Sequence, residues 1–279
     1  REITINSQTQ VLPIQTDASP ATWATGTEDG PRAGNLENRP QITANQFNAK
    51  QIILKANRLM STTFMDNHID EEVLVNLMPM LIESVARAHA RAVDEAIING
   101  TSGGAAGFDG LEALAGTVKV DVLDTNATGG TDLVITAAEF LEARKLMGKY
   151  GMNPSDLIYL VSQARYYDLI ADPGFADITD VGSNIATKIT GSVGAIYGTP
   201  VVVSDQLEAE ANTASVGYAV NVRNHIIPRL RGVSVEQDYE VMNQRNVIVA
   251  SQSLGFNQLV GNNGTTDVSV VKLIRTDAA

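Results

Sequence analysis

The stretch PMLIESVARAHARAVDEAIING, from Pro79 to Gly100, carries the clearest secondary-structure signal in the chain. Proline is favoured at the first position of a helix, because the N–H that it lacks has no intrahelical partner there. Apolar side chains then recur at steps of three and four residues, which predicts a helix with one apolar face. The residues on this face are Leu81, Val85, Ala88, Ala92 and Ala96. At 1.5 Å per residue, a helix from Pro79 to Ile98 is about 30 Å long.

Upstream of this helix, two β-like stretches flank a long polar segment. Ile3 and Ile5 alternate with polar neighbours in residues 2–12, and apolar residues return at 51–55. Between them, residues 15–48 have no hydrophobic periodicity and contain the only tryptophan, Trp23. A loop of this length is uncommon inside a compact domain. It is either a functional segment ordered by a partner or a disordered surface loop.

Downstream of the helix, the pattern alternates between helical and strand-like segments. Thr136 and Glu139 form a capping box for a helix predicted to run to Tyr150. Strands are predicted at 157–161 and 201–203, with a short helix capped by Ser162 between them. The last third is rich in strand patterns, at 218–222, 233–237, 246–251 and 268–273. This mixture predicts an α+β fold.

Composition excludes several classes of protein. The 279 residues carry a net charge of −12, which argues against nucleic acid or a membrane surface as the main binding partner, since both are anionic. The chain has no cysteine, so disulfides, thiolate metal sites and a cysteine nucleophile are excluded. No apolar run approaches the roughly 20 residues of a membrane span.

Residues that could bind a metal show no convincing pattern. The three histidines are far apart in sequence and lack the spacing of metal ligands; they are His68, His89 and His225. We expect His89, next to the apolar face of the long helix, to be a packing residue. Three aspartates of one loop could bind a cation, but solvated turn carboxylates are the favoured interpretation; they are Asp172, Asp177 and Asp180. We expect no metal and no cofactor.

One string matches a catalytic motif. Residues 100–104 read G-x-S-x-G around Ser102, but a nucleophile elbow needs a strand before the serine and a helix after it. Here a helix precedes Ser102, so a helix stop and hinge is the favoured interpretation. There is also no phosphate-binding glycine motif. A hydrolase built on the α/β portion remains an alternative, and would need a strongly perturbed titratable group beside Ser102.

The order of these segments resembles the major capsid proteins of tailed bacteriophages, which have the Hong Kong 97 fold. The β-arm and polar segment resemble the family's N-terminal arm and extended loop. EEVL (71–74), followed by the helix that ends in AVDEAIING (92–100), resembles its spine helix. GTPVVVSD (198–205), YAVNV (218–222) and RGVSVEQD (231–238) resemble its later strands, and 246–251 with Gly255-Phe256 its closing strand. Encapsulin-type shells share this fold and remain an alternative.

The resemblance implies a division of the chain. It implies an N-terminal arm at 1–14, an extended β-hairpin loop at 15–56, a peripheral domain with the spine helix at 57–130, an axial domain at 131–222, and return strands of both domains at 223–279. A start at Arg1 is what removal of an N-terminal segment by a prohead protease would leave.

The resemblance also implies a function without catalysis. Hexamers and pentamers of the chain would assemble, in the host bacterial cytoplasm, into the icosahedral shell of the virion. The shell would enclose double-stranded DNA without sequence-specific contacts. Scaffold, protease, portal and decoration proteins are further implied partners, and a membrane is not.

Five residues of the polar segment are candidates for contacts between subunits: Trp23, Glu28, Asp29, Arg32 and Arg39. Tryptophan and arginine are enriched at interface hot spots. Some family members crosslink through a lysine of the extended loop and an asparagine of a neighbour. Residues 15–49 contain no lysine, so we expect no crosslink of that kind.

Overall fold

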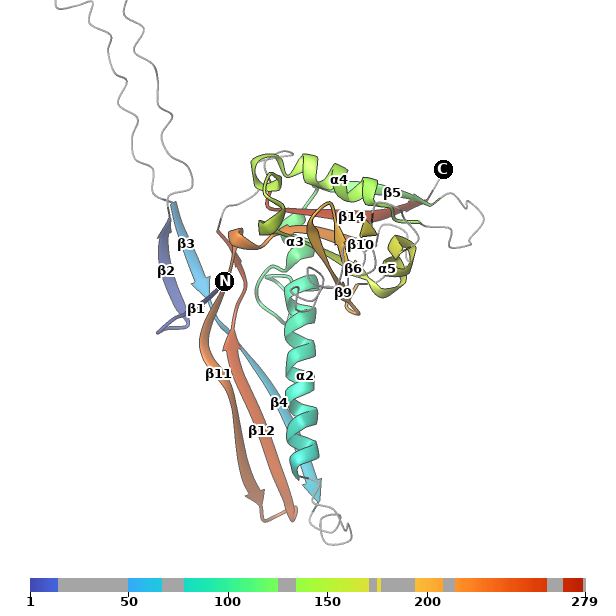
Figure 1. Cartoon of the computed structure of the whole chain (residues 1–279). Helices are drawn as coiled ribbons and strands as arrows, with labels where there is room; N and C mark the ends of the chain where they lie inside the picture. The colour runs from blue at the N-terminus through green and yellow to red at the C-terminus, as the bar shows by residue number, and fades with distance from the viewer. Residues whose placement is uncertain are drawn as a thin grey trace, which may run out of the picture. The chain divides into compact units, whose positions relative to one another are not determined.

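The computed structural model describes residues 1–14, 50–66, 78–124, 134–170, 175–176, 194–207, 214–259 and 268–277 (Figure 1). Within these ranges the helices are α2 (Met78–Asn99), α3 (Leu111–Ala115), α4 (Ala137–Leu146), α5 (Gln163–Ile170) and the 3-10 turns η2 (Gly148–Gly151), η3 (Pro154–Asp156) and η4 (Val222–Asn224). The strands are β1 (Glu2–Thr4), β2 (Thr9–Ile14), β3 (Lys50–Lys55), β4 (Asn57–Asp66), β5 (Lys119–Asp124), β6 (Leu157–Ser162), β7 (Phe175–Ala176), β8 (Gly194–Ile196), β9 (Thr199–Ser204), β10 (Ser215–Asn221), β11 (His225–Glu240), β12 (Arg245–Leu254), β13 (Asn257–Gln258) and β14 (Val270–Asp277). The chain divides into two compact units, residues 1–10 with 54–279, and residues 11–53.

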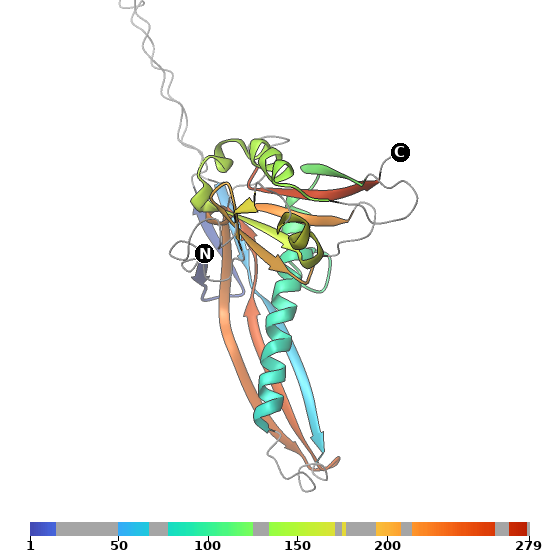
Figure 2. The same ribbon diagram turned by 45° about the vertical axis from the view of Figure 1, so that its right-hand side comes forward.

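The larger unit contains a five-stranded sheet built on long strands. Its order is β1-β11-β12-β4, and β13 pairs with the start of β11. The central strand β12 is antiparallel to both neighbours, opposing β4 from Arg245↔Asp66 to Leu254↔Asn57. In both views α2 runs alongside the long strands (Figures 1 and 2). The 22 residues of α2 span about 33 Å, close to the length of a ten-residue strand, so one helix can follow one face of the sheet.

The larger unit also contains a seven-stranded mixed sheet with helices on both faces. Its order is β5-β14-β10-β6-β9-β8-β7. Alternate residues of β6 point to opposite faces, as the two-residue period of a strand requires. Tyr159 and Val161 pack with Phe140 of α4, whereas Leu160 packs with Leu111 of α3 on the other face. The apolar cluster around Leu111 and Leu160 also includes Ile98, near the C-terminal end of α2.

Most of the local expectations are confirmed. The capping box of Thr136 and Glu139 is present, strands occupy the expected positions, and α2 ends immediately before Gly100. The predicted end of the helix at Tyr150 is wrong, because α4 ends at Leu146 and a 3-10 turn follows. Gly148 has a φ of 53°, a left-handed conformation that a continuing α-helix does not allow.

The smaller unit contains, in its described part, residues 11–14 of β2 and 50–53 of β3, two strands that form a two-stranded sheet. They are the two β-like stretches expected around the polar segment, except that the first is divided into β1 and β2. The segment itself, residues 15–49, lies outside the described residues.

The domain limits implied by the resemblance stay predictions. The seven-stranded sheet takes β5 from the expected peripheral segment, β6 and β10 from the expected axial segment, and β14 from the return strands. A limit at residue 130 therefore separates β5 from the sheet in which it pairs.

A polar network fastens α3 to the seven-stranded sheet. The Glu112 carboxylate accepts hydrogen bonds from Ser215, from the Tyr218 hydroxyl at 2.6 Å and from Lys272 Nζ at 2.7 Å. Burial by itself would raise the pKa of Glu112, but these hydrogen bonds outweigh it and hold the pKa below the ordinary value. Burial, together with the bond to Glu112, raises the pKa of Tyr218.

We predict that Glu112→Ala lowers the free energy of unfolding by about 1–3 kcal/mol, because it leaves the Lys272 ammonium and the Tyr218 hydroxyl without this acceptor. Urea denaturation measures the loss. Glu236→Ala is the matched control, since Glu236 pairs with Arg231 at an exposed surface and such pairs contribute about 0–1 kcal/mol.

The difference between wild type and Glu112→Ala should depend on pH. A carboxyl whose folded-state pKa is lowered stabilises the fold above its unfolded pKa, and this stabilisation is lost as the pH falls through the folded value. The gap should therefore be full at pH 7 and shrink below about pH 4. If this difference in the free energy of unfolding did not change with pH, the lowered pKa assigned to Glu112 would be wrong.

Candidate inter-subunit surfaces

The five candidates of the polar segment, Trp23, Glu28, Asp29, Arg32 and Arg39, lie outside the described residues. The surfaces that the structure describes come instead from α2, the long strands and the corner between the two sheets.

The apolar face of α2 differs from the prediction at one position. Val85 is buried, and Leu81 and Ala92 are half-buried, as expected of packing residues. Ala88 is exposed, so its assignment to the face is wrong, and His89 is buried in its place. The buried side follows steps of four, four and three residues, from 81 through 85 and 89 to 92. The sequence pattern missed this because it took only apolar side chains.

A hydrogen bond satisfies one of the two ring nitrogens of His89 on the buried side, whereas Nδ1 has no partner among the described residues. His89 Nε2 lies 2.8 Å from Ser61 Oγ on β4. Buried polar groups are tolerated when they find such partners. Ser61 precedes His89 by 28 residues, and the local sequence of neither residue identifies the other. The pair confirms the expectation that His89 is a packing residue.

The opposite side of α2 is charged and connects to the seven-stranded sheet. Glu83 pairs with Arg87 at 2.6 Å, as the four-residue spacing predicts. Arg91, which the same spacing would pair with Glu95, instead bonds Asp205 after β9 at 3.0 Å. Asn99 Nδ2 donates to the carbonyl of Gln206 at 3.0 Å. Two contacts thus tie the helix to the end of β9.

The face of the long sheet that points away from α2 combines apolar and charged rows. Directly opposed residues of antiparallel strands share a face, so Phe64 and Val247 lie on the side opposite Ser61. Met60 and Phe64 are 56% and 52% exposed. The Arg245 guanidinium lies 4.0 Å over the Phe64 ring and pairs with Glu240. Exposed aromatic, methionine and arginine side chains are the types enriched at protein interfaces.

The turn between β11 and β12 is also apolar. Val241 is 74% exposed and Met242 is 95% exposed. Large apolar side chains so fully in solvent, at the end of a long hairpin, suit a contact surface better than a free surface.

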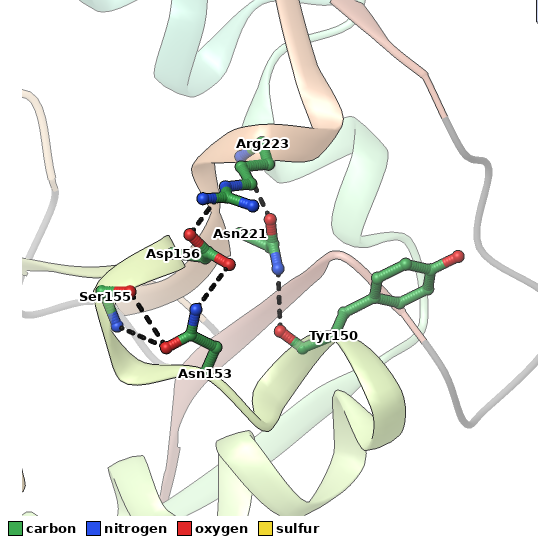
Figure 3. Close-up of polar contacts among 6 residues, drawn as sticks. All are labelled: Tyr150, Asn153, Ser155, Asp156, Asn221 and Arg223. Carbon is green, nitrogen blue, oxygen red and sulfur yellow. Dashed lines mark hydrogen bonds and ion pairs between the residues drawn. The ribbon is translucent and has the colours of Figure 1, made fainter.

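A cluster of hydrogen bonds stabilises the corner where the chain passes from β10, in the seven-stranded sheet, to β11, in the five-stranded sheet (Figure 3). Asn221 is its centre: its Oδ1 accepts from the backbone N–H of Arg223, and its Nδ2 donates to the carbonyl of Tyr150 at 2.8 Å. The Tyr150 ring points away from the cluster (Figure 3). Arg223 pairs with Asp156 at 2.7 Å, and Asn153 donates to Asp156 at 2.9 Å. The corner is therefore braced against the turns before β6.

His225 extends this corner into the core. Its Nδ1 lies 2.8 Å from the carbonyl of Asn221, which can only accept, so Nδ1 carries the proton. Its ring stacks on Phe256, with 5.2 Å between centroids. Burial lowers the pKa of His225 to about 4, against the opposing effect of the hydrogen bond to Asn221.

The catalytic and metal candidates are not brought together. Ser102 follows α2, and its backbone N–H donates to Asp109 Oδ1 at 2.7 Å, so the strand that a nucleophile elbow requires is not there. In the described ranges, no group of three or more histidine, aspartate or glutamate residues is placed to hold a metal ion. Four candidates lie outside those ranges: His68, Asp172, Asp177 and Asp180. None of the helices in the described part of the chain is long and apolar enough to cross a membrane.

Comparison with solved structures defines the class of fold. A chain of Microbacterium phage Oxtober96 has a TM-score of 0.69 and 16% identity, covering 100% of this chain and 89% of that chain. A chain from the capsid of a native GTA particle has a TM-score of 0.65 and 14% identity, covering 99% of this chain and 87% of that chain. The chain therefore has the α+β fold of phage capsid shells, the Hong Kong 97 type expected from its sequence.

Sequence comparison leads to one particular relative. The chain is 30% identical, over 261 residues, to the major capsid protein of Escherichia phage T5, covering 94% of this chain and 55% of the relative. It thus spans about half the length of the curated relative that it matches. No protein-family model matches the chain. The resemblance to tailed-phage major capsid proteins is confirmed.

We predict that Val85→Asp lowers the free energy of unfolding by about 3 kcal/mol or more, because it buries an unpaired carboxylate between α2 and the long sheet. Chemical denaturation measures the loss. Ala88→Asp, one turn along on the exposed side, is the matched control and should change stability by about 0.5 kcal/mol. Equal losses in both variants would contradict the burial assigned to the helix.

We also predict that His225 destabilises the fold in acid. A histidine with a lowered folded pKa favours folding above its unfolded pKa, and that contribution is lost as the pH falls from 6.5 towards 4. The loss should approach about 3 kcal/mol over this window. Urea midpoints measured across it should fall less steeply for His225→Phe, which keeps an aromatic ring but cannot titrate. If the urea midpoints of both proteins fell equally steeply with pH, the lowered pKa of His225 would be refuted.

Proposed function

We propose that this chain is the shell-forming part of a tailed-phage major capsid protein, and that many copies assemble into the icosahedral head enclosing double-stranded DNA. The observation that carries the proposal is the 30% identity to the phage T5 major capsid protein across 94% of this chain. Such identity runs through both sheets and α2, so it concerns the whole described architecture and not one motif.

The surface chemistry supports a structural role. The described residues expose apolar side chains on an extended sheet and at the end of a hairpin, where Met242 is almost wholly in solvent. Assembly would remove this area from water, at about 25 cal/mol for each Å² of apolar surface. The mechanism is association: two sheets joined by one helix present several separate contact surfaces.

The net charge of −12 suits a container for DNA better than a DNA-binding protein, because the inner surface need not hold the polymer tightly. Hexamers and pentamers of the chain, a place in the virion shell, and assembly in the host cytoplasm follow from this proposal. So do a scaffold, a protease, a portal and decoration proteins as further partners.

Electron microscopy of the purified chain tests the proposal. Closed shells, filled with DNA when isolated from infected cells, are the expected result. Shells that contain a protein cargo and no DNA would favour the encapsulin alternative. Monomers that stay dispersed at all concentrations would overturn the proposal.

A deletion tests the part played by the polar segment. We predict that removal of residues 18–38 leaves a folded chain whose shells do not form or break easily, because that stretch adds little to a core but contains Trp23 and Arg32. Circular dichroism reports the fold and sedimentation reports the shells. An unfolded deletion variant, or shells of wild-type strength, would contradict the prediction.

A further inference from the structure

An apolar pocket of about 200 Å³ lies on the face of the seven-stranded sheet that α4 does not cover. Ile97 of α2, Leu160 of β6 and Phe256 contribute walls, and the more exposed lining residues are Val222 and Arg1. All of these residues belong to the larger unit. An apolar cavity of about 150 Å³ already accommodates benzene, so this pocket has room for one large apolar side chain.

The described lining of the pocket presents one polar feature, a positive charge. His225 lines the pocket, but its Nδ1 is bonded to the Asn221 carbonyl and its Nε2 is buried. Arg1 is the charged residue of the lining. The carboxylate next to it in sequence, that of Glu2, pairs with Arg229 at 2.6 Å. The pocket therefore suits an apolar group that has a negative charge beside it.

The turn between β11 and β12 has this complementary chemistry. Met242 is 95% exposed, the highest value among the large apolar side chains of the described ranges, and Val241 beside it is also exposed. Asp238 and Glu240 precede them on one face of β11, as the two-residue period of a strand requires. Asp238 accepts a hydrogen bond from the backbone N–H of Tyr239 and has no ion pair within the described ranges.

Contacts within the turn fix its shape. The Glu240 carboxylate accepts a hydrogen bond from Asn243 and pairs with Arg245 at 2.6 Å. The backbone of Gln244 is in the left-handed region, with a φ of 48°. A turn that is already ordered loses little conformational freedom on binding. The flexible side chain of Met242 can still adapt to an irregular pocket, as methionine commonly does.

The pocket and the turn of one chain cannot meet. Strand β11 begins at His225, which lines the pocket, and ends at Glu240, two residues before Met242. A strand of 16 residues spans roughly 50 Å at about 3.3 Å per residue. Both views show the β11–β12 turn at one end of the larger unit, far from the start of β11 (Figures 1 and 2). Met242 can therefore reach only the pocket of another copy.

We propose that the pocket receives Met242 of a second copy of this chain, with Asp238 of that copy near Arg1. The proposal rests on the proposed function, in which many copies lie side by side, and adds a specific contact to it. Each copy provides one pocket and one turn, at opposite ends of one long strand. Head-to-tail contacts of this kind close into rings or continue as open chains, so the contact repeats from copy to copy.

A disulfide pair tests the contact directly, because the chain contains no cysteine of its own. In the double variant Met242→Cys with Val222→Cys, air oxidation should link copies into a ladder that extends beyond the dimer on a non-reducing gel. Met242→Cys with Val134→Cys is the matched control, because Val134 is 55% exposed but precedes α4, on the other face of the sheet. It should give no such ladder. No ladder from the first pair, or equal ladders from both, would overturn the proposal.

Sedimentation measures the same contact without oxidation. Met242→Ala and Val222→Phe, which fills the pocket, should each weaken association about tenfold or more while circular dichroism stays unchanged. The double variant should be no weaker than the weaker single variant, because both changes remove one contact. Met152→Ala is the matched control, since Met152 is 77% exposed and does not line the pocket. Wild-type association of Met242→Ala, or losses that multiply in the double variant, would overturn the proposal.

The two proposals can fail separately. Shells in the micrographs without a disulfide ladder would refute the pocket contact and keep the shell. A ladder at high protein concentration without shells would keep the contact and refute the shell.

Discussion

The packing of Ile98 at the end of α2 is the constraint on which the larger unit depends. Ile98 belongs to a core that includes Leu254 of the long sheet and Tyr218 of the seven-stranded sheet. One helix end therefore holds both sheets. The chain can turn away there only because position 100 is glycine: a Cβ on Gly100 would lie 2.2 Å from the Ala96 carbonyl oxygen, closer than atoms approach.

From this junction the two sheets take different roles. The seven-stranded sheet is covered on both faces along much of its length and contains the largest fully buried side chains, Tyr159 and Tyr218. The long sheet is covered by α2 on one face, and its other face keeps Met60 and Phe64 in solvent. One sheet is well buried within the chain, whereas the other leaves large apolar side chains exposed. Such exposure is expected of a subunit whose apolar surface is covered by neighbouring subunits.

The link between the sheets contains one of the groups whose protonation affects stability. His225 and Asn221 lie at the corner through which the chain passes from one sheet to the other, and Arg91 and Asp205 join the helix to the end of β9. Protonation of His225 in its buried position is unfavourable, so acid is expected to destabilise the corner between the sheets.

Local sequence determined the elements of this protein. The helix before Gly100, the capping box at Thr136 and the valine-rich strands each depend on neighbours within a few residues, and all are found. The order of these elements was enough to indicate the capsid fold.

Only the tertiary structure decided which side of α2 is buried and where its charges pair. His89 is on the buried side, where Ser61 of β4 is its hydrogen-bond partner. Arg91 pairs with Asp205 and not with Glu95, because β9 ends beside the helix. The pocket beside His225 likewise takes its walls from α2, β6 and the segment after β12. Such contacts join residues far apart in sequence, and a local pattern contains no information about which distant side chain will arrive.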